Sequence, residues 1–118
     1  MEASLLSLKG AHVALYVRDL ARSRAFYQKV LGMAPSYELE GIVGYGLFPG
    51  LSLNLVKDLQ KATPSSAPTL TLAVKDLQGL YQRLRAEGVL FLAPPEKGPF
   101  AWKAIFKDPD GNLIELAE

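Results

Sequence analysis

Apolar and polar residues alternate in two stretches of the chain that share one pattern. The first reads His-Val-Ala-Leu-Tyr-Val-Arg-Asp-Leu over residues 12–20, and the second reads Thr-Leu-Thr-Leu-Ala-Val-Lys-Asp-Leu over residues 69–77. Alternation of this kind is typical of a strand with one buried face, and the two stretches overlay without a gap. A repeated strand followed by a repeated aspartate predicts a tandem repeat of one structural unit.

A helical pattern follows each of these two strands. Aspartate is a good N-cap, because its side chain accepts a hydrogen bond from the first helical turn. Glycine readily takes the left-handed conformation that ends a helix. The first helix is expected over residues 20–31, between Asp19 and Gly32, and the second from Asp76 to about residue 87, before Gly88.

Three short strands are expected after each helix. In the first unit they cover residues 34–39, 42–48 and 51–56. In the second unit a strand at residues 89–91 leads through a loop, 94–99, into a closing hairpin. The segment Asp108-Pro-Asp-Gly111 predicts the turn of this hairpin, because proline pre-sets the first corner and glycine accepts the left-handed residue.

These elements predict how the chain is organised. Two half-modules, about residues 8–60 and 68–118, are joined by a small, polar linker with two prolines at residues 61–68. Each half has one helix and four strands and cannot close its own sheet, so the halves must join within a chain or between chains. We expect a single α+β domain of tandem βαβββ repeats, with a curved eight-stranded mixed sheet around a cleft and the helices outside.

Strand alternation assigns candidate residues to the cleft. If the leucine and valine faces pack on the helices, the opposite faces line the cleft. The only histidine, His12, and the carboxylate of Glu115, a candidate catalytic residue, then fall on equivalent inner faces. Tyr16 could stack on a planar ligand and Lys103 could receive an anionic group, although such residues also pack or reach solvent. The candidate ligand-binding residues are His12, Tyr16, Ser52, Asn54, Thr69, Thr71, Lys103, Ile105 and Glu115.

Composition removes several functional classes. The 118 residues carry a formal net charge of +1 without a basic stripe, which argues against a nucleic-acid partner. The chain has no cysteine, so disulfides, thiolate metal sites and cysteine nucleophiles are excluded. No signal-peptide pattern is evident, and glycines and a proline break the longest uncharged run, so no membrane span is expected. A cytoplasmic protein is expected.

Three segments together form one pattern: the first strand with its cap, residues 26–33 and residues 108–116. The second reads Phe-Tyr-Gln-Lys-Val-Leu-Gly-Met, and the third reads Asp-Pro-Asp-Gly-Asn-Leu-Ile-Glu-Leu. This pattern resembles the vicinal oxygen chelate superfamily, which includes glyoxalase I, bleomycin-resistance proteins, fosfomycin-resistance enzymes, methylmalonyl-CoA epimerase and extradiol dioxygenases. The resemblance covers residues 8–118. It is specific for the fold and weak for the reaction.

The resemblance also implies positions for metal ligands. Metal-dependent members use a histidine on the first strand, a histidine that opens the second repeat and a glutamate on the last strand; some add a glutamate or glutamine on the fourth strand. Here the first and last positions hold His12 and Glu115, whereas the other two hold Thr69 and Asn54. Threonine is a poor replacement for imidazole, so the resemblance implies no cofactor or a weakly bound divalent metal.

Three functions remain open from the sequence. The first is a metal-free protein that binds a small molecule between two subunits of a homodimer, similar to the bleomycin-resistance branch. The alternative is a metal-dependent lyase, isomerase or dioxygenase of the glyoxalase I type with an incomplete ligand set. A third is a regulatory or scaffold dimer with a vestigial cleft. Whether the chain is an enzyme is left open by the residues.

Overall fold

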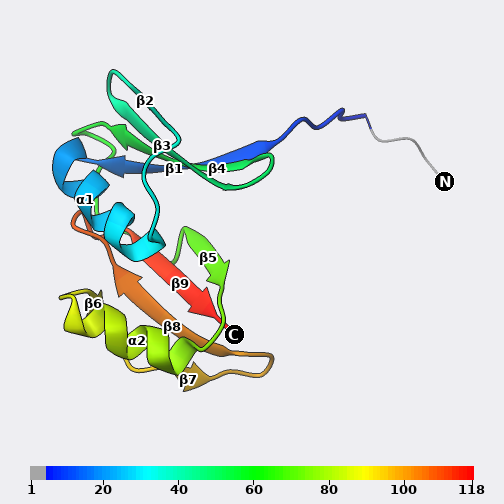
Figure 1. Cartoon of the computed structure of the whole chain (residues 1–118), viewed down its shortest axis with the longest axis vertical. Helices are drawn as coiled ribbons and strands as arrows, with labels where there is room; N and C mark the ends of the chain where they lie inside the picture. Colours follow the sequence, from blue (N-terminus) through cyan, green and yellow to red (C-terminus); the bar gives the residue numbers. More distant parts are fainter. Residues whose placement is uncertain (1–4) are drawn as a thin grey trace.

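The structure, a computed structural model, describes residues 5–118 and places the strands in two sheets. The first sheet has the strand order β1-β4-β3-β2 (Figure 1). β1 runs parallel to β4, and the other neighbours are antiparallel. Its strands are β1 (Ala11–Val17), β2 (Tyr37–Leu39), β3 (Ile42–Phe48) and β4 (Leu51–Lys57).

The second sheet has the order β5-β9-β8-β6, and the short strand β7 also pairs with β8. As in the first sheet, the opening strand β5 runs parallel to the last strand β9, and β8 is antiparallel to both β9 and β6. Its strands are β5 (Leu70–Ala73), β6 (Leu90–Phe91), β7 (Glu96–Lys97), β8 (Trp102–Lys107) and β9 (Leu113–Ala117).

The two helices, α1 (Leu20–Leu31) and α2 (Leu77–Ala86), confirm the capping argument. The Asp19 carboxylate accepts a hydrogen bond from the backbone of Arg22 at 3.1 Å, and Gly32 ends α1 in the left-handed conformation. Asp76 caps α2 in the same way by accepting from the backbone of Gly79 at 3.2 Å. In the part of the chain that the structure describes, neither helix is long and apolar enough to cross a membrane.

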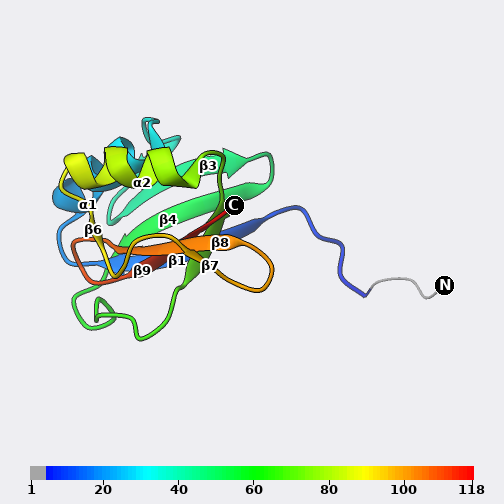
Figure 2. The ribbon, with the colours of Figure 1, turned by 90° about the horizontal axis from the view of Figure 1, so that it is seen from below.

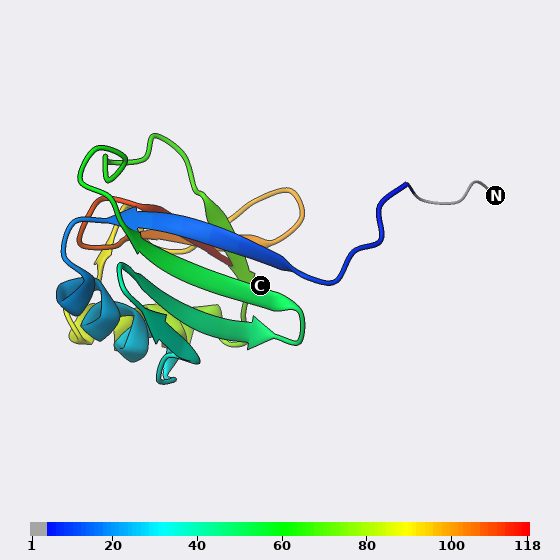
Figure 3. The same cartoon turned by 90° about the horizontal axis from the view of Figure 1, so that it is seen from above.

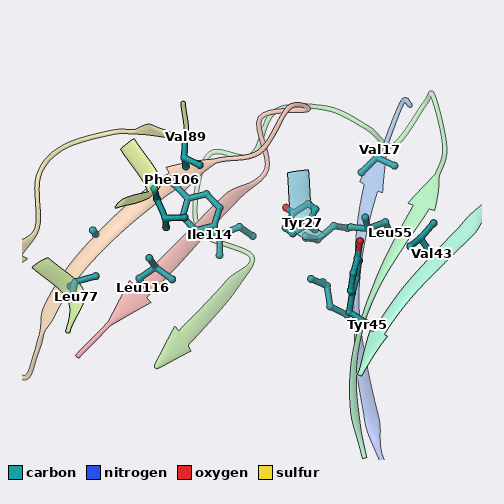
Figure 4. Packing of buried hydrophobic residues seen from close by; sticks show 14 residues of the cluster. Val17, Tyr27, Val43, Tyr45, Leu55, Leu77, Val89, Phe106, Ile114 and Leu116 are labelled. Atoms are coloured by element: carbon teal, nitrogen blue, oxygen red, sulfur yellow. The ribbon is translucent and has the colours of Figure 1, made fainter. Parts of the chain in front are cut away.

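One hydrophobic core joins both sheets and both helices. Leu15 and Leu55 of the first sheet and Phe106 and Leu116 of the second belong to the same buried cluster. The core side chains of the two sheets point toward one another, with Tyr27 of α1 between them (Figure 4). Figures 2 and 3 show both helices along the same side of the molecule. Burial of the leucines and valines at alternate strand positions is therefore as the pattern predicts.

The fold class is confirmed, but the sheet within one chain differs in two details from the expected continuous eight strands. The strands divide into a four-stranded and a five-stranded sheet, because β1 and β5 lie at sheet edges and do not pair with each other. In addition, the expected loop 94–99 contains β7, in which Glu96 pairs with Lys103 and Lys97 with Trp102. Two residues are too few for the alternation on which a strand prediction rests.

The turn between β8 and β9 is buried and is tied to α1. The carboxylate of Asp108 accepts a hydrogen bond from the Tyr27 hydroxyl at 2.7 Å and from the backbone of Asp110 and Asn112 at 2.9 Å each. Burial raises the pKa of the Tyr27 phenol, and the neighbouring Asp108 carboxylate raises it further. The phenol therefore stays protonated and donates to the carboxylate.

The same turn is fixed to the end of β1. Asp110 accepts hydrogen bonds from the backbone of Arg18 at 3.0 Å and from the hydroxyl of the fully buried Ser23 at 3.3 Å. The Asn112 amide donates to the backbone oxygen of Tyr16 at 3.1 Å. These bonds join residues about ninety positions apart in sequence and hold the second sheet in place relative to the first.

Replacing Tyr27 with phenylalanine should lower the free energy of unfolding by about 1–3 kcal/mol, because the buried Asp108 carboxylate loses a donor. Urea unfolding measures the change. The matched control is Tyr81→Phe, since the Tyr81 hydroxyl only accepts a hydrogen bond from exposed Arg85; its effect should stay within about 0.5 kcal/mol. An equal loss in both variants would contradict the assigned role of the turn.

The hydrogen bond from Tyr27 also makes the stability of the protein depend on pH. Because the folded state raises the pKa of Tyr27, its stabilising contribution is complete below the unfolded value of about 10 and is lost as the pH rises further. Wild-type protein should therefore lose stability above about pH 10 more steeply than Tyr27→Phe.

Candidate functional site

The polar face of the first sheet carries four of the sequence-predicted residues. In the parallel pairing of β1 with β4, His12 lies beside Ser52, and Asn54 lies two positions further along. Tyr16 shares this side of β1, because alternate strand residues point to the same side. His12 is exposed and the other three are half-buried, so the alternation places all four on the face that the sequence assigns to them.

Tyr37 covers part of this face and was missed by sequence reasoning. Tyr37 pairs with Gly44 across β2 and β3, and Gly44 pairs with Asn54 across β3 and β4. The Tyr37 ring lies over Gly44, where an added Cβ would overlap the ring, and its hydroxyl donates a hydrogen bond to Asn54 Oδ1. The glycine opposite a tyrosine was the signal in the sequence, but it is visible only once the strand register is known.

The polar face of the second sheet carries Thr71, Ile105 and Glu115 in one row across β5, β9 and β8. Glu115 Oε1 accepts a hydrogen bond from the Thr71 hydroxyl at 3.0 Å. Lys103 Nζ lies 3.8 Å from the same oxygen. The Glu115 side chain is 16% exposed, so this ion pair is partly shielded from water. Glu115 therefore contacts both Thr71 and Lys103 and lies opposite Ile105.

A pocket opens beside this row. It encloses about 260 Å³, and its walls are Lys103, Ile105 and Glu115 together with residues of the 92–98 segment. The segment that the sequence describes as a loop thus forms one side of the pocket, with β7 fixing it to β8. A lysine, a carboxylate and an apolar floor can hold a small molecule that has both polar and apolar parts.

Thr69 and Tyr16 come together elsewhere, at the linker. Both line a hollow of about 510 Å³ beside residues 61–68. Lys61 Nζ lies 5.1 Å from the centre of the Tyr16 ring, so the ring already has a cationic neighbour. Thr69 precedes β5, and its hydroxyl donates to the backbone oxygen of Leu113 at 3.4 Å.

Within one chain, the two polar faces are both directed away from the shared core. The apolar residues of both sheets point toward one another (Figure 4), so the residues between them in sequence point to the other sides. The pocket that contains Glu115 is lined by second-sheet residues and the 92–98 segment, and His12 does not line it. Among residues 5–118, no group of three or more His, Asp or Glu residues could hold a metal ion.

Three of the four residues at the implied ligand positions already make hydrogen bonds within the described chain. A tightly bound divalent metal needs several nitrogen or oxygen ligands that are free to bind it. Asn54 Oδ1 accepts from Tyr37 and Glu115 Oε1 accepts from Thr71, while the Thr69 hydroxyl points to Leu113. One imidazole and one partly engaged carboxylate are a weak ligand set.

A family model provides the decisive comparison. The model described as Glyoxalase/Bleomycin resistance protein/Dioxygenase superfamily matches residues 9–116. The chain belongs to this superfamily. The resemblance drawn from the sequence is therefore confirmed over nearly the whole chain.

Relatives within this superfamily differ in what their names state. Lactoylglutathione lyase of Salmonella typhimurium is 34% identical over 121 residues, covering 91% of this chain and 90% of the relative. A glyoxalase/bleomycin resistance protein from Catenulispora acidiphila has a TM-score of 0.76 at 27% identity, covering 95% of this chain and 98% of the other. TnmS3, an antibiotic-binding protein from Streptomyces sp. CB03234, has a TM-score of 0.75 at 25% identity, covering 98% of each chain.

Metal affinity tests whether these donor atoms form only a weak site for a divalent metal. Nickel or manganese titrated into metal-free protein should bind no tighter than tens of micromolar, on the order of −6 kcal/mol. Isothermal calorimetry on protein without a histidine tag is the measurement. A sub-micromolar dissociation constant that disappears in His12→Ala would contradict this interpretation.

Proposed function

We propose that this protein is a cytoplasmic homodimer that binds a small molecule without a tightly bound metal. The ligand lies between the polar face of the first sheet of one copy and that of the second sheet of the other. One observation carries this proposal: both polar faces are directed away from the core of their own chain. A cleft that needs both faces is therefore completed by a second copy.

The free sheet edges support this arrangement. β1, with seven residues, lies at the edge of the first sheet, and β5 lies at the edge of the second. An open edge presents unpaired backbone donors and acceptors that another strand can satisfy. Pairing β1 of one copy with β5 of the other joins the two sheets into the continuous sheet expected from the repeat. Twofold symmetry then creates two equal clefts.

The chemistry of the faces supports a binding role. The first sheet contributes an imidazole, a hydroxyl and an amide from His12, Ser52 and Asn54, and the second contributes the Lys103–Glu115 pair and Ile105. Few polar groups on an otherwise apolar pocket wall orient a ligand and give specificity. The antibiotic-binding protein among the solved structures is consistent with this role.

The second candidate is a metal-dependent lyase, isomerase or dioxygenase. It is favoured by His12 and Glu115, which stand at two ligand positions of the metal-dependent members, and by the 34% identity to a lactoylglutathione lyase. Superfamily members often bind a divalent metal. In this reading Glu115 would be the catalytic carboxylate, and stoichiometric metal in protein purified without a tag would favour it.

The cleft can be tested by building a metal site in it. Thr69→His should add an imidazole to His12 and Glu115 and strengthen cobalt(II) binding at least tenfold, about 1.4 kcal/mol. The absorption spectrum of cobalt(II) reports both affinity and coordination. In the matched control, Thr69→His with Glu115→Ala, most of the gain should vanish. A gain that persists in the control would place the new ligand outside the proposed cleft.

Mixing two double variants tests whether the cleft lies between copies. One carries Thr69→His with His12→Ala, and the other carries Thr69→His with Glu115→Ala. Each alone lacks a complete site, but a mixed dimer contains one intact site. An equal mixture should recover about one tight site in four relative to Thr69→His alone. No recovery would mean that the ligands come from a single chain, and the proposed assembly would be wrong.

A further inference from the structure

The Tyr37 side chain lies across the first-sheet face, with its ring over a glycine and its hydroxyl bonded to Asn54. Its ring crosses β3 over Gly44 and reaches Asn54 on β4. Any side chain at position 44 would overlap the ring atoms Cζ, Cε1 and Cε2, so the glycine makes this position of the ring possible. β2 lies next to β3 at the edge of the sheet in Figure 1, which places the tyrosine at the rim of the face.

The backbone that carries Tyr37 is anchored by its neighbours. The backbone N–H of Ser36 donates to Gly44 O at 2.7 Å, and the Ser36 hydroxyl accepts from the backbone of Gly46 at 2.9 Å. Glu38, which points to the opposite side, forms a 2.7 Å ion pair with Arg24 of α1. The ring is therefore positioned by the sheet and the helix, before any ligand arrives.

The hydrogen bond from Tyr37 determines what Asn54 offers to a ligand. An asparagine amide has one acceptor oxygen and two N–H donors. Because the Tyr37 hydroxyl donates to Oδ1, the amide nitrogen is turned to the other side. Within residues 5–118 this nitrogen has no hydrogen-bond partner among the side chains and backbone around it. It is a fixed donor beside a tyrosine that is 39% exposed.

We propose that Tyr37 is a positioning residue that makes Asn54 a hydrogen-bond donor for a flat ligand with an acceptor oxygen. The ligand class is a ring that bears a carbonyl or carboxylate: the oxygen accepts from Asn54 Nδ2, and the ring lies against the face of Tyr37. This inference rests on the proposed small-molecule cleft and adds the chemistry that the cleft selects. The same bond also engages the oxygen that Asn54 would otherwise offer to a metal.

Two matched probes test the acceptor. Acetophenone carries a carbonyl oxygen, and isopropenylbenzene has the same shape with a methylene group in its place. Titration into ¹⁵N-labelled protein, followed by NMR, gives both affinities and the shift of the Asn54 side-chain amide. Wild-type protein should prefer acetophenone by about fivefold, the range of one neutral hydrogen bond. Acetophenone alone should shift the Asn54 amide signal.

Two variants distinguish the orientation of the Asn54 amide by Tyr37 from a merely structural role of the tyrosine. In Tyr37→Phe the amide is no longer fixed, so the preference for acetophenone should fall to about twofold or less. In Asn54→Asp the hydrogen bond from Tyr37 is kept but the donor is lost, so the preference should disappear or reverse. Asn54→Asp also answers the question if Tyr37→Phe does not fold. Tyr81→Phe, on the distant helix α2, should leave the preference unchanged.

The possible failures are distinguishable. Equal binding of both probes to wild-type protein overturns the role of Tyr37 and leaves the small-molecule cleft intact. A full preference that survives in folded Tyr37→Phe, or in Asn54→Asp, does the same. Binding of neither probe at the first-sheet face overturns the cleft itself, and this inference with it.

Discussion

The rest of this structure depends on one constraint: successive side chains of a strand point to opposite sides of the sheet. Side chains alternate along a strand, so a sheet that buries its leucines on one side must present its polar residues on the other. Both sheets here use their apolar sides for one common core. His12 and Glu115 are consequently committed to surfaces that leave the core in different directions, and a shared cleft for them needs a second copy.

The buried turn around Asp108 fixes the position of one sheet relative to the other. The two sheets have no strand pairing with each other among the described residues, so their relative position depends on the core and on the bonds from Asp108, Asp110 and Asn112 to α1 and β1. Removing the hydrogen bonds that a tyrosine hydroxyl and several backbone N–H groups donate to a buried carboxylate costs free energy of folding. The polar faces are thus held at a defined angle to each other, as the proposed cleft between two copies requires.

Much of the fold could be predicted, because alternation and capping are local. The helix cap Asp19, the helix end at Gly32 and the buried face of β1 each depend only on residues a few positions away. The structure has all three as expected. Other features depend on partners far along the chain. The ring of Tyr37 lies over Gly44 because of strand register, and β7 is too short for a pattern. The buried Asp108 is bonded to Tyr27, which is far away in sequence. The sequence around Asp108 predicts a turn, and only the packing of α1 converts that turn into the link between the sheets.

The contact between the two polar faces is the most direct test of this account. A dimer can be prepared in which one copy is labelled with ¹³C and the other is not, and isotope-filtered NMR then detects only contacts between copies. The account predicts nuclear Overhauser effects from the face that carries His12 and Ala14 of one copy to the face that carries Ile105 and Glu115 of the other. A protein that remains a monomer at millimolar concentration, or a dimer in which these faces show no contacts between copies, would contradict it.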